Sequence, residues 1–356
     1  MVKQKLVATL LSITTIASLI TGCGSSKANE SAQAAENNAQ AAEVEASADS
    51  SEKETIRWAV MTNGLDYYTA LVGIEYGIYE KYGLNIELTE YAWGINTVDA
   101  IVNGTADVGN LADYAAVNRF GNTAKDTNLV MFTQLSGGGA RTGGLYVAPQ
   151  YAEDLSSLDG SEGFITTIGT VTDYYNSLII EYLGLDESKQ NLLNTDSAQT
   201  GLALAQNGEA SAVYASGSNE AYYQNYGWVL AVPASEIGIE TYSYLITTRE
   251  YSADNTETLG KLLQGINESY EYVGEHIDDV AKFLEGKTGV KADDFKATWA
   301  ATNLTIGFND SGVGQLQKIE EWAYAHERFA EEYDVTQFIE TEALELAFPD
   351  KVTYKK

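Results

Sequence analysis

The sequence has few of the residues that cross-link chains, coordinate metals or carry positive charge. Its 356 residues include one cysteine, three prolines and two histidines, with 21 Lys and Arg against 51 Asp and Glu. The single cysteine, Cys23, excludes an internal disulfide. His276 and His326 match no metal-binding spacing and lie in acidic, helical surroundings. We interpret both as exposed helix residues, and we expect no metal ion and no cofactor.

Basic residues are too scarce for a nucleic-acid partner. A formal net charge of −30 leaves no basic stripe that would release counterions from phosphates. An anionic ligand is still possible, because a cleft can be locally positive. Nucleophile-elbow and Walker motifs are also missing from the sequence. No Cys–His pair is left for catalysis once the single cysteine is assigned to lipid modification. We therefore expect the protein not to be an enzyme.

The longest uncharged apolar run lies at the N-terminus. Lys3 and Lys5 precede Leu6–Ile20, which is too short for a comfortable transmembrane span. A basic start, a short apolar core and the ending Ile20–Thr21–Gly22–Cys23 resemble a lipoprotein signal. We expect cleavage after residue 22 and modification of Cys23 with fatty acyl chains such as palmitate. The alternative is an ordinary signal peptide with an incidental cysteine.

A low-complexity segment follows the cysteine. Residues 23–54 are rich in Ser, Ala, Glu and Asn, and they include no aromatic residue. Such a segment cannot bury enough apolar surface to offset the entropy of ordering. We predict a disordered tether between the lipid and a folded body.

The folded body opens with alternating strands and helices. Strands are expected at Ile56–Met61, Asn85–Glu90 and Ala106–Leu111, each followed by a helical pattern. This alternation predicts a mainly parallel sheet, with ligands beyond the carboxyl ends of the strands. Those ends are the segments Asn63–Tyr67, Trp93–Asn96 and Asn110–Tyr114.

Three motifs in this region carry a family resemblance. They are GIYEKYGLNIEL after the first helix, the turn Trp93–Gly94, and the helix ending NGTADVG. In this order they resemble the solute-binding proteins of ABC importers, in the branch for aliphatic sulfonates, taurine, nitrate and thiamine-precursor pyrimidines. The segment YDVTQFIET near the end is similar to the family's closing segment. The resemblance implies an α/β, two-lobed periplasmic-binding-protein fold of type II (Venus flytrap), with a helical C-terminal segment.

Two crossings of the chain are expected between the lobes. The glycine-rich residues 136–144 are interpreted as the first crossing, a hinge or ligand-facing loop, with a plain surface loop as the alternative. Thr241–Thr247 would return the chain. The pattern AIVNGTADVG is echoed by LAQNGEASAV, which agrees with two lobes of similar topology. The predicted organisation is a signal peptide at 1–22, a tether at 23–54, lobe 1 at 55–147 plus 241–356, and lobe 2 at 148–240.

The resemblance also implies the ligand-binding residues. It places the first wall at Asn63, Asp66, Tyr67, Trp93, Gly94, Leu111 and Ala112, and the second at Thr170, Thr172, Tyr174, Tyr214 and Ser216. As an alternative, Thr170 and Thr172 cap their own helix. Arg141 is the only cation near a predicted cleft loop. If Arg141 points inward, it would favour an anion, and if it points outward, a neutral or aromatic heterocycle. Asp66 and the tyrosines would suit an amine or a pyrimidine.

Together these patterns predict a receptor outside the cytoplasm. Its two lobes would close on a small solute and deliver it to an ABC permease, with a lipid anchor on the extracytoplasmic face of the cell membrane. We expect a monomer. A surface sensor, or an enzyme on the same fold, is the alternative.

Overall fold

The computed structural model describes residues 53–62, 64–92, 94–137, 143–216 and 218–354, without the side chains of 124–127 and 218. The predicted signal peptide and most of the predicted tether lie outside these ranges. So do four predicted functional residues: Cys23, Asn63, Trp93 and Arg141. The proposals that involve these residues rest on the sequence alone.

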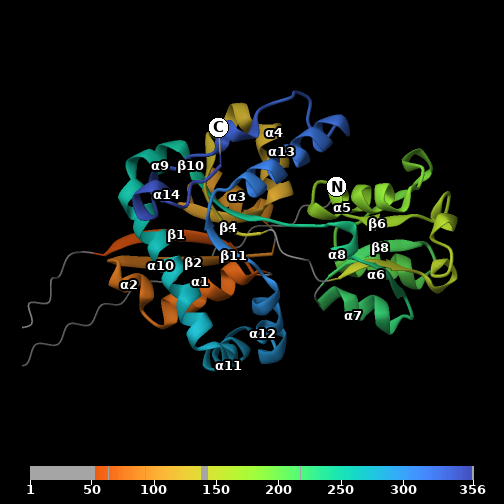
Figure 1. The fold of residues 1–356 in the computed structure, drawn as a ribbon, viewed down its shortest axis with the longest axis horizontal. Coiled ribbons are helices and arrows are strands. Elements are labelled where there is room, and N and C mark those ends of the chain that lie inside the picture. The colour runs from red at the N-terminus through yellow and green to blue at the C-terminus, as the bar shows by residue number, and fades with distance from the viewer. Residues whose placement is uncertain (1–52, 63, 93, 138–142, 217, 355–356) are drawn as a thin grey trace, which may run out of the picture. The chain divides into compact units, whose positions relative to one another are not determined.

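A six-stranded sheet contains the predicted first three strands (Figure 1). Its strands are β1 (Glu54–Met61), β2 (Leu84–Tyr91), β3 (Val108–Ala112), β4 (Leu129–Ser136), β10 (Ser243–Thr248) and β11 (Leu304–Gly307), in the order β11-β4-β10-β3-β1-β2. β1 pairs in parallel with β2 and β3, whereas β10 is antiparallel to β3 and β4. The expected parallel arrangement is therefore confirmed for β1 to β4, and β10 and β11 run the other way.

A five-stranded sheet repeats this arrangement. Its strands are β5 (Gly144–Val147), β6 (Phe164–Thr166), β7 (Leu192–Asn194), β8 (Ala212–Ala215) and β9 (Val229–Pro233), in the order β7-β6-β8-β5-β9. In each sheet one of the reversed strands, β10 or β5, follows in the chain on strands of the other sheet, which explains its opposite direction. The echoed helix endings also match, since Gly104 and Gly208 both have a φ of 70°. The predicted similarity of topology is confirmed.

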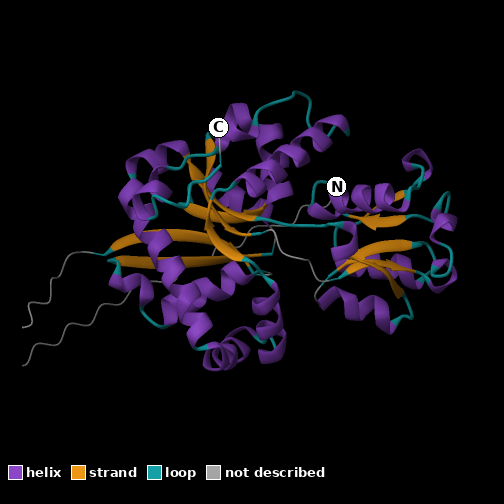
Figure 2. Cartoon of the chain, viewed as in Figure 1, coloured by secondary structure: helices purple, strands orange, loops and turns teal. Residues whose placement is uncertain are grey.

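Helices pack on both sheets (Figure 2). With the six-stranded sheet are α1 (Leu65–Glu75), α2 (Ile78–Lys81), α3 (Gly94–Val102), α4 (Asp113–Thr127), α9 (Arg249–Asp254), α10 (Thr256–Glu275), α11 (Ile277–Thr288), α12 (Ala292–Ala301), α13 (Asp310–Ala325) and α14 (Glu342–Ala347). With the five-stranded sheet are α5 (Val171–Leu183), α6 (Ala198–Gln206), α7 (Ser218–Asn225) and α8 (Ala234–Ile237). Within the described ranges, no helix is both long and apolar enough to span a membrane.

The C-terminal helices return to the six-stranded sheet, as expected. α10 packs against α1 and α14, and α13 packs against α4. The predicted apolar face of α10 is buried, with Leu259, Leu262 and Leu263 fully covered. One element in this segment was not expected, because we predicted it to be largely helical. β11 pairs with β4 at only two positions, across an irregularity, and so short a strand has too little alternation to be recognised.

The strand pairing bears on the limits of the lobes. The predicted first lobe runs to residue 147 and so includes β5, yet β5 hydrogen-bonds to β8 and β9 in the five-stranded sheet. We propose placing the limit before β5, in the glycine-rich segment. Gly143, with a φ of 83°, lies at that point, and a Cβ there would be 2.1 Å from the carbonyl oxygen of Ala215. The expected need for glycine at a close backbone approach is thus met.

Replacing Gly144 by alanine is expected to destabilise the protein by about 1–3 kcal/mol. Its Cβ would lie 2.1 Å from the backbone oxygen of Val232, so β5 and β9 would have to separate. Chemical denaturation monitored by circular dichroism measures the change. The matched control is Gly314→Ala inside α13, where nothing lies within 4 Å and helix propensity favours a gain of up to about 1 kcal/mol. Equal effects of the two substitutions would contradict the packing argument.

Candidate functional site

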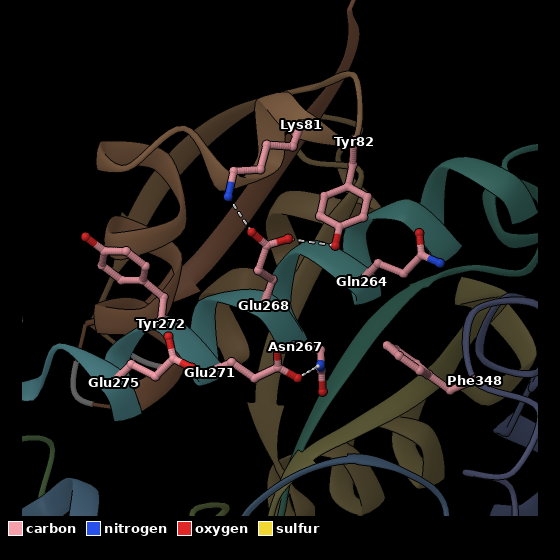
Figure 3. A pocket seen from close by; sticks show the side chains of 9 residues that line it. All are labelled: Lys81, Tyr82, Gln264, Asn267, Glu268, Glu271, Tyr272, Glu275 and Phe348. Carbon is pink, nitrogen blue, oxygen red and sulfur yellow. Dashed lines mark hydrogen bonds and ion pairs between the residues drawn. The ribbon is translucent and has the colours of Figure 1, made fainter.

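Two surface hollows lie away from the predicted strand-end site. One, of about 560 Å³, follows α2 and α10 (Figure 3). The other, of about 620 Å³, lies beside the start of α13. In the first, Glu268 accepts hydrogen bonds from Lys81 at 2.5 Å and from the hydroxyl of Tyr82 at 2.8 Å. Neither hollow is lined by a predicted site residue, and the polar groups of the first are partly engaged with one another.

The carboxyl ends of β1 and β3 meet the start of α1 at a buried carboxylate, Asp66. This residue stands in the first turn of α1 and is 4 % exposed. The side-chain amide of Asn110 donates to its Oδ2 at 2.9 Å, and the hydroxyl of Ser243 donates to the same oxygen at 2.5 Å. Asn110 also accepts a bond from the backbone N–H of Met61 at 3.0 Å. Side chains from β3 and β10 thus hold Asp66 in place.

The surroundings of Asp66 are mostly uncharged. Burial raises the pKa of this carboxyl, and the bonds from Ser243 and Asn110 oppose the rise. Its charge contributes in turn to a raised pKa of Tyr270 on α10, for which burial is the main cause. No cation pairs with Asp66 among the residues that the structure describes. A carboxylate so placed is costly unless something else satisfies it.

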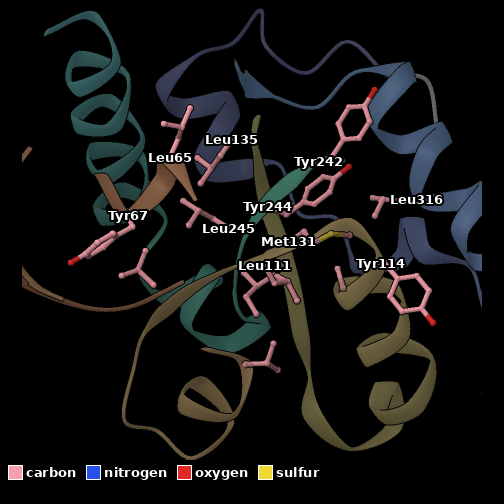
Figure 4. Close-up of a cluster of buried hydrophobic side chains, with 14 of the residues drawn as sticks. Leu65, Tyr67, Leu111, Tyr114, Met131, Leu135, Tyr242, Tyr244, Leu245 and Leu316 are labelled. Carbon is pink, nitrogen blue, oxygen red and sulfur yellow. The ribbon is translucent and has the colours of Figure 1, made fainter. Parts of the chain in front are cut away.

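Two other described residues of the predicted first wall, Tyr67 and Leu111, belong to the buried apolar cluster of Figure 4. Tyr67 donates to Glu90 at 2.7 Å, and burial together with Glu90 raises the pKa of its hydroxyl to about 12. Leu111 is 1 % exposed, and a Cβ on Gly94 would lie 2.9 Å from its Cβ, so glycine lets α3 approach β3. Ala112, which precedes α4, is partly exposed. The structure therefore brings the described residues of this wall to one edge of the sheet.

The predicted second wall lies at the start of α5 and the end of β8. Thr170 donates to the carbonyl of Thr167 at 2.7 Å, and the hydroxyl of Thr172 accepts from the N–H of the same residue at 3.1 Å. Both threonines thus stabilise their own turn and remain partly exposed. Tyr214 is buried against Tyr175, with ring centroids 4.8 Å apart. Ser216 is partly exposed.

An aromatic and ionic cluster beside this wall was not expected from the sequence. Asp173, in the first turn of α5, has a fully buried side chain that accepts two bonds from Arg328, at 2.8 and 3.0 Å. The hydroxyl of Tyr114 donates to it at 3.1 Å. The predicted site residue Tyr174 packs against both Tyr114 and Trp322, with ring centroids 6.3 and 5.2 Å away. This cluster joins α5 to α4 and to the segment after α13.

The two histidines take different positions. His276 is exposed, as expected. His326 is only partly exposed, stacks on Trp322 at 4.4 Å and lies 3.1 Å from a carboxylate oxygen of Glu187, so the expectation of a plain exposed residue was wrong for it. No group of three or more His, Cys, Asp or Glu residues is arranged for a metal ion within the described part of the chain.

Comparisons with known structures agree with the fold. The periplasmic aliphatic sulphonate binding protein SsuA from Escherichia coli superposes with a TM-score of 0.68 at 14% identity, covering 81% of this chain and 92% of its own. The periplasmic nitrate-binding protein NrtA from Synechocystis PCC 6803 gives 0.63 at 13%, covering 83% and 88%. A Candida albicans protein described as having the generic periplasmic binding protein fold gives 0.61 at 14%, covering 84% and 96%.

At these identities the structural matches establish the fold alone, which is the predicted two-lobed periplasmic-binding-protein type. Among curated proteins, none matches the sequence. A profile described as NMT1/THI5 like matches residues 65–279, from α1 to α11. This match spans more than half of the chain and includes every strand of the five-stranded sheet. The chain therefore belongs to the NMT1/THI5-like family.

Proposed function

We propose that this protein is the solute receptor of an ABC importer, and that it works as a monomer outside the cytoplasm. One observation carries the proposal: polar and aromatic side chains gather at the carboxyl ends of the strands, with Asp66 and Asn110 buried in the first sheet. Open α/β sheets bind ligands at such ends. Two proteins of the same fold support the transport role, because one is named for sulfonate ABC transport and another as the ligand binding component of an ABC-type import system.

In this proposal, the two walls approach each other around a solute. The first wall presents Ala112 and the start of α4, and the second presents Thr170, Thr172 and Ser216, which are partly exposed. Closure is a population shift towards the conformation that binds the solute more tightly. The closed form is the one that a permease would recognise. Asn63, Trp93 and Arg141 lie outside the described residues and remain part of the proposed site because they follow β1, β2 and β4 in the sequence.

The cognate solute is expected to stabilise the protein by about 2.7 kcal/mol at a concentration one hundred times its Kd. Native mass spectrometry of the purified chain would first identify a co-purifying small molecule. Differential scanning calorimetry with that molecule then measures the gain in stability, and mass analysis of the recovered molecule separates binding from turnover.

A matched pair of variants locates the binding. Ser216→Ala at the second wall is expected to weaken it, whereas Glu271→Gln in the hollow of Figure 3 is expected to leave it unchanged. If the solute no longer stabilises Glu271→Gln but still stabilises Ser216→Ala, the binding site lies in that hollow. If the recovered molecule proves to be chemically converted, the protein is an enzyme and not a receptor.

We also propose that Cys23 carries the lipid anchor. The signal-like residues 1–22 and the uniqueness of this cysteine support the proposal. Two or more acyl chains on one residue are enough to hold a protein at a membrane. Cys23→Ala is expected to move the mature protein from the membrane fraction to the soluble fraction after cell fractionation. A variant that stays with the membrane would refute lipid anchoring and leave the solute-binding proposal intact.

A further inference from the structure

The two oxygens of Asp66 are used differently. Oδ2 accepts both hydrogen bonds, from Asn110 at 2.9 Å and from Ser243 at 2.5 Å. Oδ1 receives no hydrogen bond from the described residues. The residue is nevertheless buried, with 4 % of its surface still accessible at the carboxyl end of the sheet. One acceptor atom of a buried acid is therefore left open.

A purely structural role does not explain this arrangement. A serine or an asparagine at position 66 would accept the same two donors without bringing a charge into the interior. A buried carboxylate without a counter-ion is strongly unfavourable, and such groups persist mainly where function requires them. The donors that surround Asp66 are both neutral, a hydroxyl and an amide. What the site lacks is a positively charged donor.

We propose that the solute carries a positively charged nitrogen group, a protonated amine or an amidine, that donates to Oδ1 of Asp66. This inference rests on the proposed function and names the class of solute. Such a group would neutralise the carboxylate and form the charge-assisted hydrogen bond that the protein leaves unmade. A sulfonate or nitrate oxygen at the same point would face a like charge. The solute thus differs at this end from the anions for which the structural relatives are named.

Asp66→Asn isolates the missing contact. The amide oxygen can keep the bonds from Asn110 and Ser243, while its NH₂ replaces Oδ1 and offers a donor instead of an acceptor. The matched control is Asp254→Asn, an exposed acid at the end of α9. Binding is measured by isothermal titration of the full-length chain with matched probes. These are benzamidine against benzenesulfonate, propylamine against propanesulfonate, taurine against isethionate, and nitrate.

The unmodified chain is expected to prefer the cationic member of at least one pair. Asp66→Asn is expected to weaken that binding by about 10- to 100-fold, the usual value of one charge-assisted bond. Asp254→Asn is expected to bind like the unmodified chain. The preference among probes needs no variant, so it remains decisive if Asp66→Asn does not fold.

Two results would overturn this inference but leave the proposed function as a solute receptor intact. One is binding of a sulfonate or of nitrate with no cationic probe bound. The other is binding of a cation that Asp66→Asn leaves unchanged, which would reduce Asp66 to a structural residue. If no probe binds and native mass spectrometry finds no small molecule on the protein, the proposed function itself fails.

Discussion

Replacing Arg328 by alanine is expected to lower the free energy of unfolding by about 3–5 kcal/mol. The substitution would leave the carboxylate of Asp173 without a counter-charge, and that side chain is fully buried. The remaining donors are the hydroxyl of Tyr114 at 3.1 Å and the N–H of Gly169 at 3.4 Å, and both are neutral. The variant also loses the contact of Arg328 with the face of Trp322, in which the guanidinium carbon lies 5.6 Å from the ring centroid. Urea denaturation monitored by circular dichroism measures the loss.

A surface ion pair provides the control for Arg328. Lys261 lies 2.8 Å from Glu54, and both side chains are more than a third exposed, so Lys261→Ala should cost less than about 1 kcal/mol. The double change Asp173→Leu with Arg328→Met should recover much of the stability, because no charge is then buried alone. Equal losses in the two single variants would show that Asp173 is better hydrated than its burial indicates.

Asp66→Asn is expected to make the ligand-free protein more stable at neutral pH, by about 0.5–2 kcal/mol. Burial raises the pKa of this carboxyl in the folded state, so folded protein binds its proton more tightly than unfolded protein. Its contribution to stability is fully present below the unfolded pKa of about 3.9 and is lost as pH rises through the folded pKa. Asparagine does not titrate, so the advantage of the variant grows over that range and then levels off.

Denaturation curves at several pH values test this expectation. Taking the difference in free energy of unfolding between Asp66→Asn and the unmodified chain cancels the contributions of the other titrating acids. One of these is Glu54, whose pKa is lowered mainly by the bond from Lys261. The exposed Asp254→Asn should stay within about 0.5 kcal/mol of the unmodified chain throughout. A difference that shrinks as pH rises would contradict a raised pKa at Asp66.

The sequence patterns predicted the sheets well because strand periodicity and turns are local signals. The predicted strands Ile56–Met61 and Asn85–Glu90 lie within β1 and β2. The Asn–Gly helix endings predicted the shared topology for the same reason, since a left-handed glycine marks the end of a helix wherever it occurs. The reversal of β10 and β5 depends instead on where each strand enters its sheet, which no local pattern encodes.

The candidate site was predicted only as far as topology determines it. Parallel strands must end together, so Asp66 and Leu111 could be placed at one edge from chain order alone. The pair Asp173 and Arg328 is separated by 155 positions, and neither residue stands in a distinctive motif. Their contact depends on how α13 returns to α4, a tertiary arrangement that periodicity does not specify.

The position of β10 has a consequence for biosynthesis. This strand lies between β3 and β4, yet it begins at Ser243, whereas β4 ends at Ser136. A nascent chain that has emerged only as far as β4 has a gap in the middle of its first sheet. That sheet closes after the whole five-stranded sheet has been translated, and such sequence-distant pairing is intrinsically slow. The topology therefore keeps the N-terminal half from completing its core early in synthesis.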